Sequence, residues 1–112
     1  MRYIFAILLA ALLSGCSHRR TARLSDVTKP ESITLKASAS QKPAKIFRIE
    51  LHFRGQIDGD ATIGGKNVLT QHLAGTFDLK TGGDWYSDTC QLEYSPTNVH
   101  SGNVDIEYEF FE

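Results

Sequence analysis

The sequence predicts an all-β protein: a small antiparallel β-sandwich or partly open barrel of six or seven strands. Apolar and polar residues alternate with a period of two along much of residues 32–112, and turn-forming residues interrupt the alternation. The chain has 112 residues, 41% of them hydrophobic and 22% charged, which suits one globular domain. Alternation indicates antiparallel sheets with one solvated face, because parallel sheets buried on both faces have continuous apolar runs.

The clearest strand is predicted in the segment IFRIELHFR, residues 46–54. Phe47, Ile49, Leu51 and Phe53 alternate there with charged or polar side chains. A helix would scatter these four residues around its circumference, whereas a strand places them on one face. We therefore predict a half-buried strand in which all four side chains point inward.

Shorter segments with the same pattern predict the remaining strands. They are SITLKA at 32–37, ATIGGKNVL at 61–69, LAGTFDLK at 73–80, TCQLEY at 89–94 and NVDIEYEF at 103–110. Gly64 and Gly65 predict a hairpin turn, because glycine tolerates the positive φ angles of two-residue turns. TGGD at 81–84 predicts another turn, and SPTNVHSG at 95–102 predicts a loop.

The N-terminal segment has the features of an export signal. Arg2 precedes an apolar run, Ile4–Leu13, that is too short to span a bilayer but suits the hydrophobic part of a signal peptide. The last residue of this run, Leu13, is followed by Ser14 and Gly15 and then by Cys16. This arrangement resembles the lipobox of bacterial lipoprotein precursors. The alternative is an ordinary secretory signal with an incidental cysteine.

The resemblance implies a lipid on Cys16 and a location. In lipoprotein precursors the thiol receives a diacylglyceryl group, a peptidase cuts before the cysteine, and the new amino terminus is usually acylated. Two or three acyl chains anchor a protein durably, since each buried methylene contributes about 0.8 kcal/mol. Ser17 follows Cys16 where an inner-membrane lipoprotein often has Asp. The resemblance therefore favours the outer membrane, with the protein facing the periplasm.

These observations divide the chain into three parts. We predict a signal peptide at 1–15, a lipidated flexible basic tether at 16–31, and a single β-domain at 32–112. Residues 17–43 contain six basic and two acidic residues, whereas residues 44–112 contain five basic and eleven acidic ones. Arginines 19, 20 and 23 of the tether would either face anionic lipid or simply keep the linker soluble.

The segment GDWYSD is the first candidate recognition site. Trp85 and Tyr86 follow two glycines and are flanked by Asp84 and Asp88. Aromatic side chains in loops often make binding contacts, because they bury a large area at low entropic cost. The alternative is that Trp85 closes one end of the core.

Glu107 and Glu109 are the second candidate. Alternation places both on the solvent side of the last predicted strand, so we predict an acidic, partner-binding face instead of a hydrolase carboxylate pair. Cys90 shares a predicted strand face with Leu92 and Tyr94. With Cys16 lipidated it cannot form an internal disulfide, and we expect it to be a core residue instead of a reactive thiol.

The remaining motifs predict neither a cofactor nor a metal. Asp58 and Asp60 form a D-x-D pattern, but Ile63 and Leu69 occupy positions where a calcium loop needs glycine and glutamate. The four histidines have no zinc-ligand spacing, and no nucleophile elbow, phosphate loop or dinucleotide fingerprint is present. The acidic domain disfavours nucleic acid.

We therefore expect a non-catalytic envelope lipoprotein that binds the membrane through Cys16 and another envelope protein or component through its acidic β-domain. The alternative is a periplasmic immunity or inhibitor lipoprotein that neutralises a toxic or cell-wall-degrading enzyme. An acidic domain would suit a cationic target, because charge complementarity speeds encounter.

Overall fold

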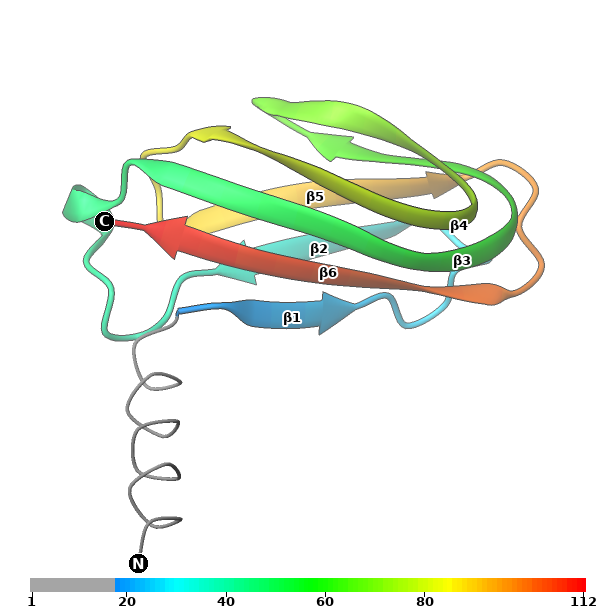
Figure 1. Ribbon diagram of the computed structural model, residues 1–112, viewed down its shortest axis with the longest axis horizontal. Helices are drawn as coiled ribbons and strands as arrows, with labels where there is room; N and C mark the ends of the chain where they lie inside the picture. The colour runs from blue at the N-terminus through cyan, green and yellow to red at the C-terminus, as the bar shows by residue number, and fades with distance from the viewer. Residues whose placement is uncertain (1–17) are drawn as a thin grey trace, which may run out of the picture.

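The computed structural model describes residues 18–112, which form six β-strands and one 3₁₀ helix (Figure 1). The elements are β1 (Arg20–Arg23), β2 (Glu31–Lys36), η1 (Pro43–Lys45), β3 (Arg48–Gly65), β4 (Val68–Asp84), β5 (Thr89–Pro96) and β6 (Gly102–Phe111). One antiparallel sheet curls into a nearly closed barrel, which confirms the predicted fold class. The signal segment and Cys16 lie outside the described residues.

None of the described residues forms a helix with the length and apolar character needed to cross a bilayer.

The long strand β3 organises the sheet. The strand order is β1-β6-β3-β5-β2, and β4 pairs along the other side of β3. The first part of β3 pairs with β6, and Ala61–Gly64 pairs with β5. A register shift between β3 and β4 lies at Ile57–Asp60, where β3 changes partner. Because bulges bend strands, the β3–β4 hairpin passes from the layer that contains β1 and β6 into the layer that contains β5 and β2 (Figure 1).

The core lies between these two layers. Every strand except β1 contributes fully buried side chains, among them Leu35, Phe53, Ile63, Leu73, Leu92, Tyr94, Val104, Ile106 and Phe110. The Tyr94 hydroxyl donates a hydrogen bond to the Val27 carbonyl, 2.7 Å away, so its polar end is satisfied. Cys90 is buried beside them, as predicted, and burial raises the pKa of its thiol to about 11.

Phe47 is the exception to the predicted inward face of β3. Phe47 is 50% exposed, whereas Ile49, Leu51 and Phe53 are buried. The strand begins only at Arg48, so Phe47 lies at the end of the core. Its backbone joins neighbouring chain segments: its N–H donates to the Phe111 carbonyl, and its carbonyl accepts from the Trp85 N–H.

Both predicted glycine turns are wrong. Gly64 and Gly65 belong to β3, and the hairpin turns at Lys66–Asn67, where Asn67 adopts a φ of 63°. Asparagine is one of the few non-glycine residues that enter this region readily. The TGGD segment belongs to β4 and pairs with β3. A Cβ on Gly82 would lie 2.6 Å from the Ile49 carbonyl oxygen, so glycine allows close strand contact here.

The prediction of a flexible tether over 16–31 is also wrong for its described part. Arg20–Arg23 forms β1, which pairs with β6 from Arg20↔Tyr108 to Arg23↔Asp105. Leu24 and Val27, just beyond it, are buried in the core. The segment is ordered because a strand distant in the sequence supplies its backbone hydrogen bonds, and the folded domain therefore begins at about Arg20.

Arg20 also joins two edge strands of the curled sheet, β1 and β2. Its Nη1 donates to the carbonyls of Lys36 and Ala37 at 3.1 and 3.2 Å. These carbonyls lie at the end of β2, whereas Arg20 begins β1. One guanidinium group thus bridges the gap that backbone pairing leaves open.

Candidate functional site: a charged face of the sheet

The outer surface of β4, β3, β6 and β1 has a dense array of ionic side chains, which we call the charged face. Strand register places neighbouring side chains in rows across the sheet, such as Asp78, Arg54, Asp105 and Arg23. The charged face consists of Arg19, Arg23, Arg48, Glu50, His52, Arg54, Asp78, Lys80, Asp84, Asp105, Glu107 and Glu109. It arises because the inward residues of these strands fill the core and their outward neighbours are charged.

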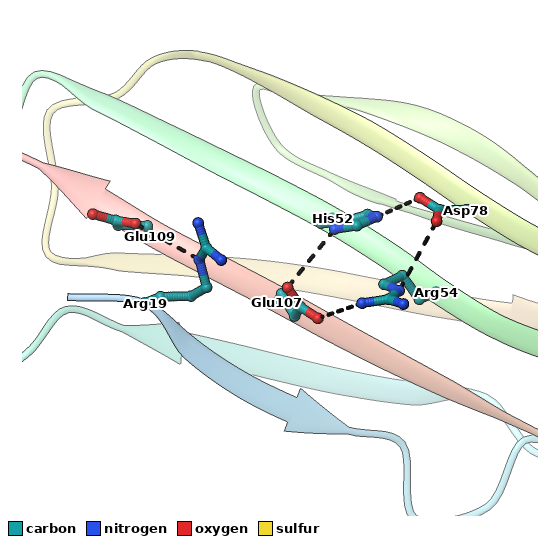
Figure 2. Close-up of polar contacts among 6 residues, drawn as sticks. All are labelled: Arg19, His52, Arg54, Asp78, Glu107 and Glu109. Atoms are coloured by element: carbon teal, nitrogen blue, oxygen red, sulfur yellow. Dashed lines mark hydrogen bonds and ion pairs between the residues drawn. The ribbon is translucent and has the colours of Figure 1, made fainter. Parts of the chain in front are cut away.

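Four side chains form a closed ring at the centre of this face (Figure 2). His52 Nε2 contacts Asp78 Oδ1, and His52 Nδ1 lies 3.8 Å from Glu107 Oε2. Arg54 Nη1 donates to Glu107 Oε1 at 3.0 Å, while its Nε lies 3.9 Å from Asp78 Oδ2. The hydrogen bond with His52 is the main cause that lowers the pKa of Asp78. The ring holds Glu107 in a defined position between His52 and Arg54.

Arg23 of β1 and Arg19, which directly precedes β1, add two arginines along the edge of β6. Arg23 donates to both carboxylate oxygens of Asp105, at 2.6 and 3.1 Å. This pair lowers the pKa of Asp105, chiefly through the hydrogen bond. Arg19 Nε lies 4.0 Å from Glu109 Oε1 (Figure 2). With the Arg20 bridge, each of the three tether arginines has a partner within the domain.

A shallow hollow of about 680 Å³ opens on the charged face, lined from β4, β3, β6 and Arg19. Glu50 on β3 stands directly opposite Glu109 on β6 within it. On its other side Glu50 is opposite Gly82, which has no side chain to fill the space. Arg48 Nη2 lies 3.5 Å from Glu50 Oε1. The hollow therefore presents two neighbouring carboxylates within a surface of mixed charge.

The structure divides the predicted recognition residues between two places. Glu107 and Glu109 line the hollow, where neighbouring side chains half-bury them. The other four residues, from Asp84 to Asp88, lie at the end of β4 and in the connection to β5. Only Asp84 is shared with the charged face, through its register position opposite Arg48.

Trp85 and Tyr86 differ sharply in exposure. Trp85 is half-buried against the core, and its Nε1–H donates to the Thr89 carbonyl at 2.9 Å. This placement fits the alternative in which Trp85 closes one end of the core. Tyr86, by contrast, is 76% exposed. Of the two aromatic candidates, only Tyr86 presents most of its side chain to solvent.

Sequence reasoning missed His52, Arg54 and Asp78 as members of a site. Alternation did place His52 and Arg54 on the solvent side of their strand. Their meeting with Asp78 and Glu107 depends on the register of β3 with both β4 and β6. Alternation along one strand contains no information on register, so only the polar outward pattern was visible.

Other acidic and histidine side chains in residues 18–112 have local structural roles. The Asp58 carboxylate accepts hydrogen bonds from the backbone N–H groups of His100 and Ser101, at 2.7 and 2.9 Å. These bonds lower its pKa and tie the β5–β6 loop to the bulge of β3. Asp60 Oδ1 lies 3.0 Å from His72 Nε2. No three His, Cys, Asp or Glu side chains in this part of the chain are placed to hold a metal ion.

Comparison with known proteins gives no relative: no protein-family model, curated protein or solved structure has a significant match to the chain.

Proposed function

We propose that this protein is a lipid-anchored, non-catalytic component of the bacterial cell envelope that binds another envelope protein or component through its charged face. The lipobox resemblance at Cys16 supports the anchor, and Ser17 favours the outer membrane with the domain facing the periplasm. The observation that carries the binding proposal is the open hollow, in which Glu50 and Glu109 are neighbours within an ordered array of ion pairs.

The geometry suits a protein surface better than a small substrate. Small-molecule sites usually enclose most of their ligand within an apolar cavity, whereas this hollow is shallow and lined by charged side chains. Contacts of Glu107 with Arg54 and His52 already hold some of these side chains across the strands, so less side-chain entropy is lost when a partner binds. Interspersed charges of both signs give specificity and speed encounter with a surface of complementary pattern.

Site-specific photo-cross-linking in cells tests the proposal. A photoreactive residue replaces Lys80, which is exposed and lines the hollow, and a matched one replaces Thr34, which is exposed on the outer surface of β2. We expect a discrete cross-linked partner from position 80 and none from position 34. The charge reversal Glu109→Arg should abolish this cross-link, whereas Glu93→Arg on β5 should preserve it. Equal cross-linking at both positions, or no cross-link at position 80, would contradict the proposal.

An immunity or inhibitor protein is the second candidate. The eleven acidic and five basic residues of 44–112 favour a cationic target. In that case deletion of the gene sensitises cells to a secreted toxic or cell-wall-degrading enzyme, and the wild-type gene restores protection. Restoration by the Glu109→Arg variant at wild-type level would show that the charged face does not bind the toxin.

A further inference from the structure

One end of the molecule gathers several distant segments of the chain, and we call it the anchor end. It contains His18 and Arg19, the β2–β3 connection 37–47, the β4–β5 connection 85–88, and Glu112 (Figure 1). Backbone hydrogen bonds join these segments, since Phe47 connects to both Phe111 and Trp85. The loops 24–30 and 97–101 lie at the opposite end (Figure 1).

The anchor end exposes aromatic surface. Three large hydrophobic residues are exposed within the described chain: Phe47 at 50%, Leu69 at 73% and Tyr86 at 76%. Phe47 and Tyr86 lie in the two connections of the anchor end. Leu69 lies near the start of β4 and lines a small hollow with Gly83 and Asp84, next to the 85–88 connection. The exposed hydrophobic residues are thus concentrated towards one end.

The distance along the chain from the proposed lipid to this end is very short. Only Ser17 separates Cys16 from His18, and β1 begins at Arg20. Four residues span at most about 14 Å when fully extended. A lipid on Cys16 therefore keeps the start of β1, and the segments beside it, within reach of the headgroup region.

We infer that the anchor end docks on the bilayer surface, with Phe47 and Tyr86 in the headgroup region and the opposite end pointing away from the membrane. The inference rests on the proposed lipidation of Cys16. Aromatic side chains favour the membrane–water interface, where an apolar ring meets hydrocarbon and polar groups stay hydrated. Docking covers aromatic surface that is otherwise exposed to water, and it leaves the charged face accessible from the side.

Charge contributes less to this docking than the aromatic residues do. Lys42 and Lys45 are exposed in the β2–β3 connection, and the exposed Arg19 lies at the same end beside Glu109, so three basic side chains are available to anionic lipid. Asp84, Asp88 and Glu112 lie at the same end and oppose that attraction. We therefore expect the orientation to depend only weakly on the anionic lipid content of the membrane.

The only tryptophan of the chain makes the orientation measurable, because Trp85 lies at the anchor end. Full-length lipidated protein is reconstituted in phosphatidylethanolamine–phosphatidylglycerol vesicles that contain a headgroup-nitroxide lipid, which quenches nearby tryptophan. The matched control is Trp85→Phe combined with Asn98→Trp, which moves the fluorophore to an exposed loop at the opposite end. We expect several-fold stronger quenching for Trp85. Equal quenching, or stronger quenching at position 98, would overturn the inference.

Two further measurements separate this inference from the anchor proposal. Flotation with the vesicles and the mass of the N-terminal peptide report whether Cys16 carries lipid. Absence of that lipid overturns both proposals, whereas a lipidated, floating protein with unquenched Trp85 overturns only the docking. The double variant Phe47→Ser with Tyr86→Ser should float normally with reduced quenching, and Thr34→Ser should match wild type. Unchanged quenching in the aromatic variant would overturn the role of the two side chains.

Discussion

The two outer faces of the curled sheet cover the same core with different side chains. The outer face of β2 and β5 presents mainly hydroxyl and amide groups, from Ser32, Thr34, Lys36, Thr89, Gln91, Glu93 and Ser95. The charged face instead pairs ionic groups across four strands. Both faces lie over the same fully buried core. The β2–β5 face shows that the solvated strands of this fold can be polar with few charges, so folding does not require the ionic density of the charged face.

The largest expected loss of stability comes from substitutions in the core that both faces cover. Phe53 supports the charged face and Leu92 supports the β2–β5 face, and both are fully buried. We expect Phe53→Ala to lower the free energy of unfolding by about 3–5 kcal/mol and Leu92→Ala by about 2–5 kcal/mol. Urea denaturation followed by circular dichroism measures both, with Phe53→Leu as a milder variant. A near-neutral result at either site would show that its face does not depend on the shared core.

Neighbouring glycines at the edge of the charged face give the next largest effect. A Cβ at position 82 would collide with the Ile49 carbonyl, whereas one at position 83 has nothing within 4 Å. We expect Gly82→Ala to cost about 1–3 kcal/mol and Gly83→Ala to remain within about 0.5 kcal/mol of wild type. The two urea midpoints provide the comparison. Similar midpoints would contradict the close approach of β4 to β3.

Acid should affect the charged face more than the β2–β5 face. Hydrogen bonds from His52 and Arg23 lower the pKa values of Asp78 and Asp105 below 3.8, their ordinary value. A native pKa below the unfolded one stabilises the folded state above that unfolded value, and this contribution is lost as the pH falls through the native pKa. The urea concentration at the unfolding midpoint should therefore decrease as the pH is lowered below about 4.

Variants separate this acid effect from that of other carboxylates, including Asp58 and Asp26, whose pKa values are also lowered. The double variant Asp78→Asn with Asp105→Asn should lose less stability between pH 5 and pH 3 than wild type does. Glu93→Gln on β5 serves as the matched control and should keep the wild-type loss. Identical pH dependence in all three proteins would rule out a special contribution of the charged face.

The smallest effect is the coupling within one exposed ion pair. Arg54 and Glu107 make a 3.0 Å contact, yet both side chains remain partly exposed. A double-mutant cycle with Arg54→Met and Glu107→Gln should give a coupling of about 0.2–1 kcal/mol that decreases with added salt. The Ser32–Glu93 contact on the other face provides a comparison with one charged partner. A larger, salt-independent coupling would mean that the ring acts as a buried network.

Local sequence patterns predicted the strands better than their connections. Alternation identified the inward residues of β3 from Ile49 to Phe53, together with those of β5 and β6, because each pattern depends only on neighbours along one strand. It failed at Phe47, since the pattern does not reveal where backbone pairing begins. Gly82 and Gly83 suggested a turn, but a glycine can equally permit a close contact between strands.

Features that depend on distant pairing could not be predicted. Strand β1 has four residues, three of them exposed, so only its partner β6 reveals it as part of the sheet. Glu107 and Glu109 were identified as outward residues of β6. Their surroundings were not, because the ring and the hollow also require the registers of β3 with β4 and β6. Site membership here is a property of three aligned strands.

The pairing of β1 with β6 also determines when the domain can complete its fold. Residues Arg20–Arg23 find their partners only at Asp105–Tyr108, near the end of the chain. Until that last strand has been made and, in an exported protein, moved across the membrane, β1 and the early part of β3 have unpaired edges. Such long-range pairing slows folding and leaves partly folded chains prone to aggregation. Until β6 has emerged, β1 and the early part of β3 must therefore be kept from pairing with other chains.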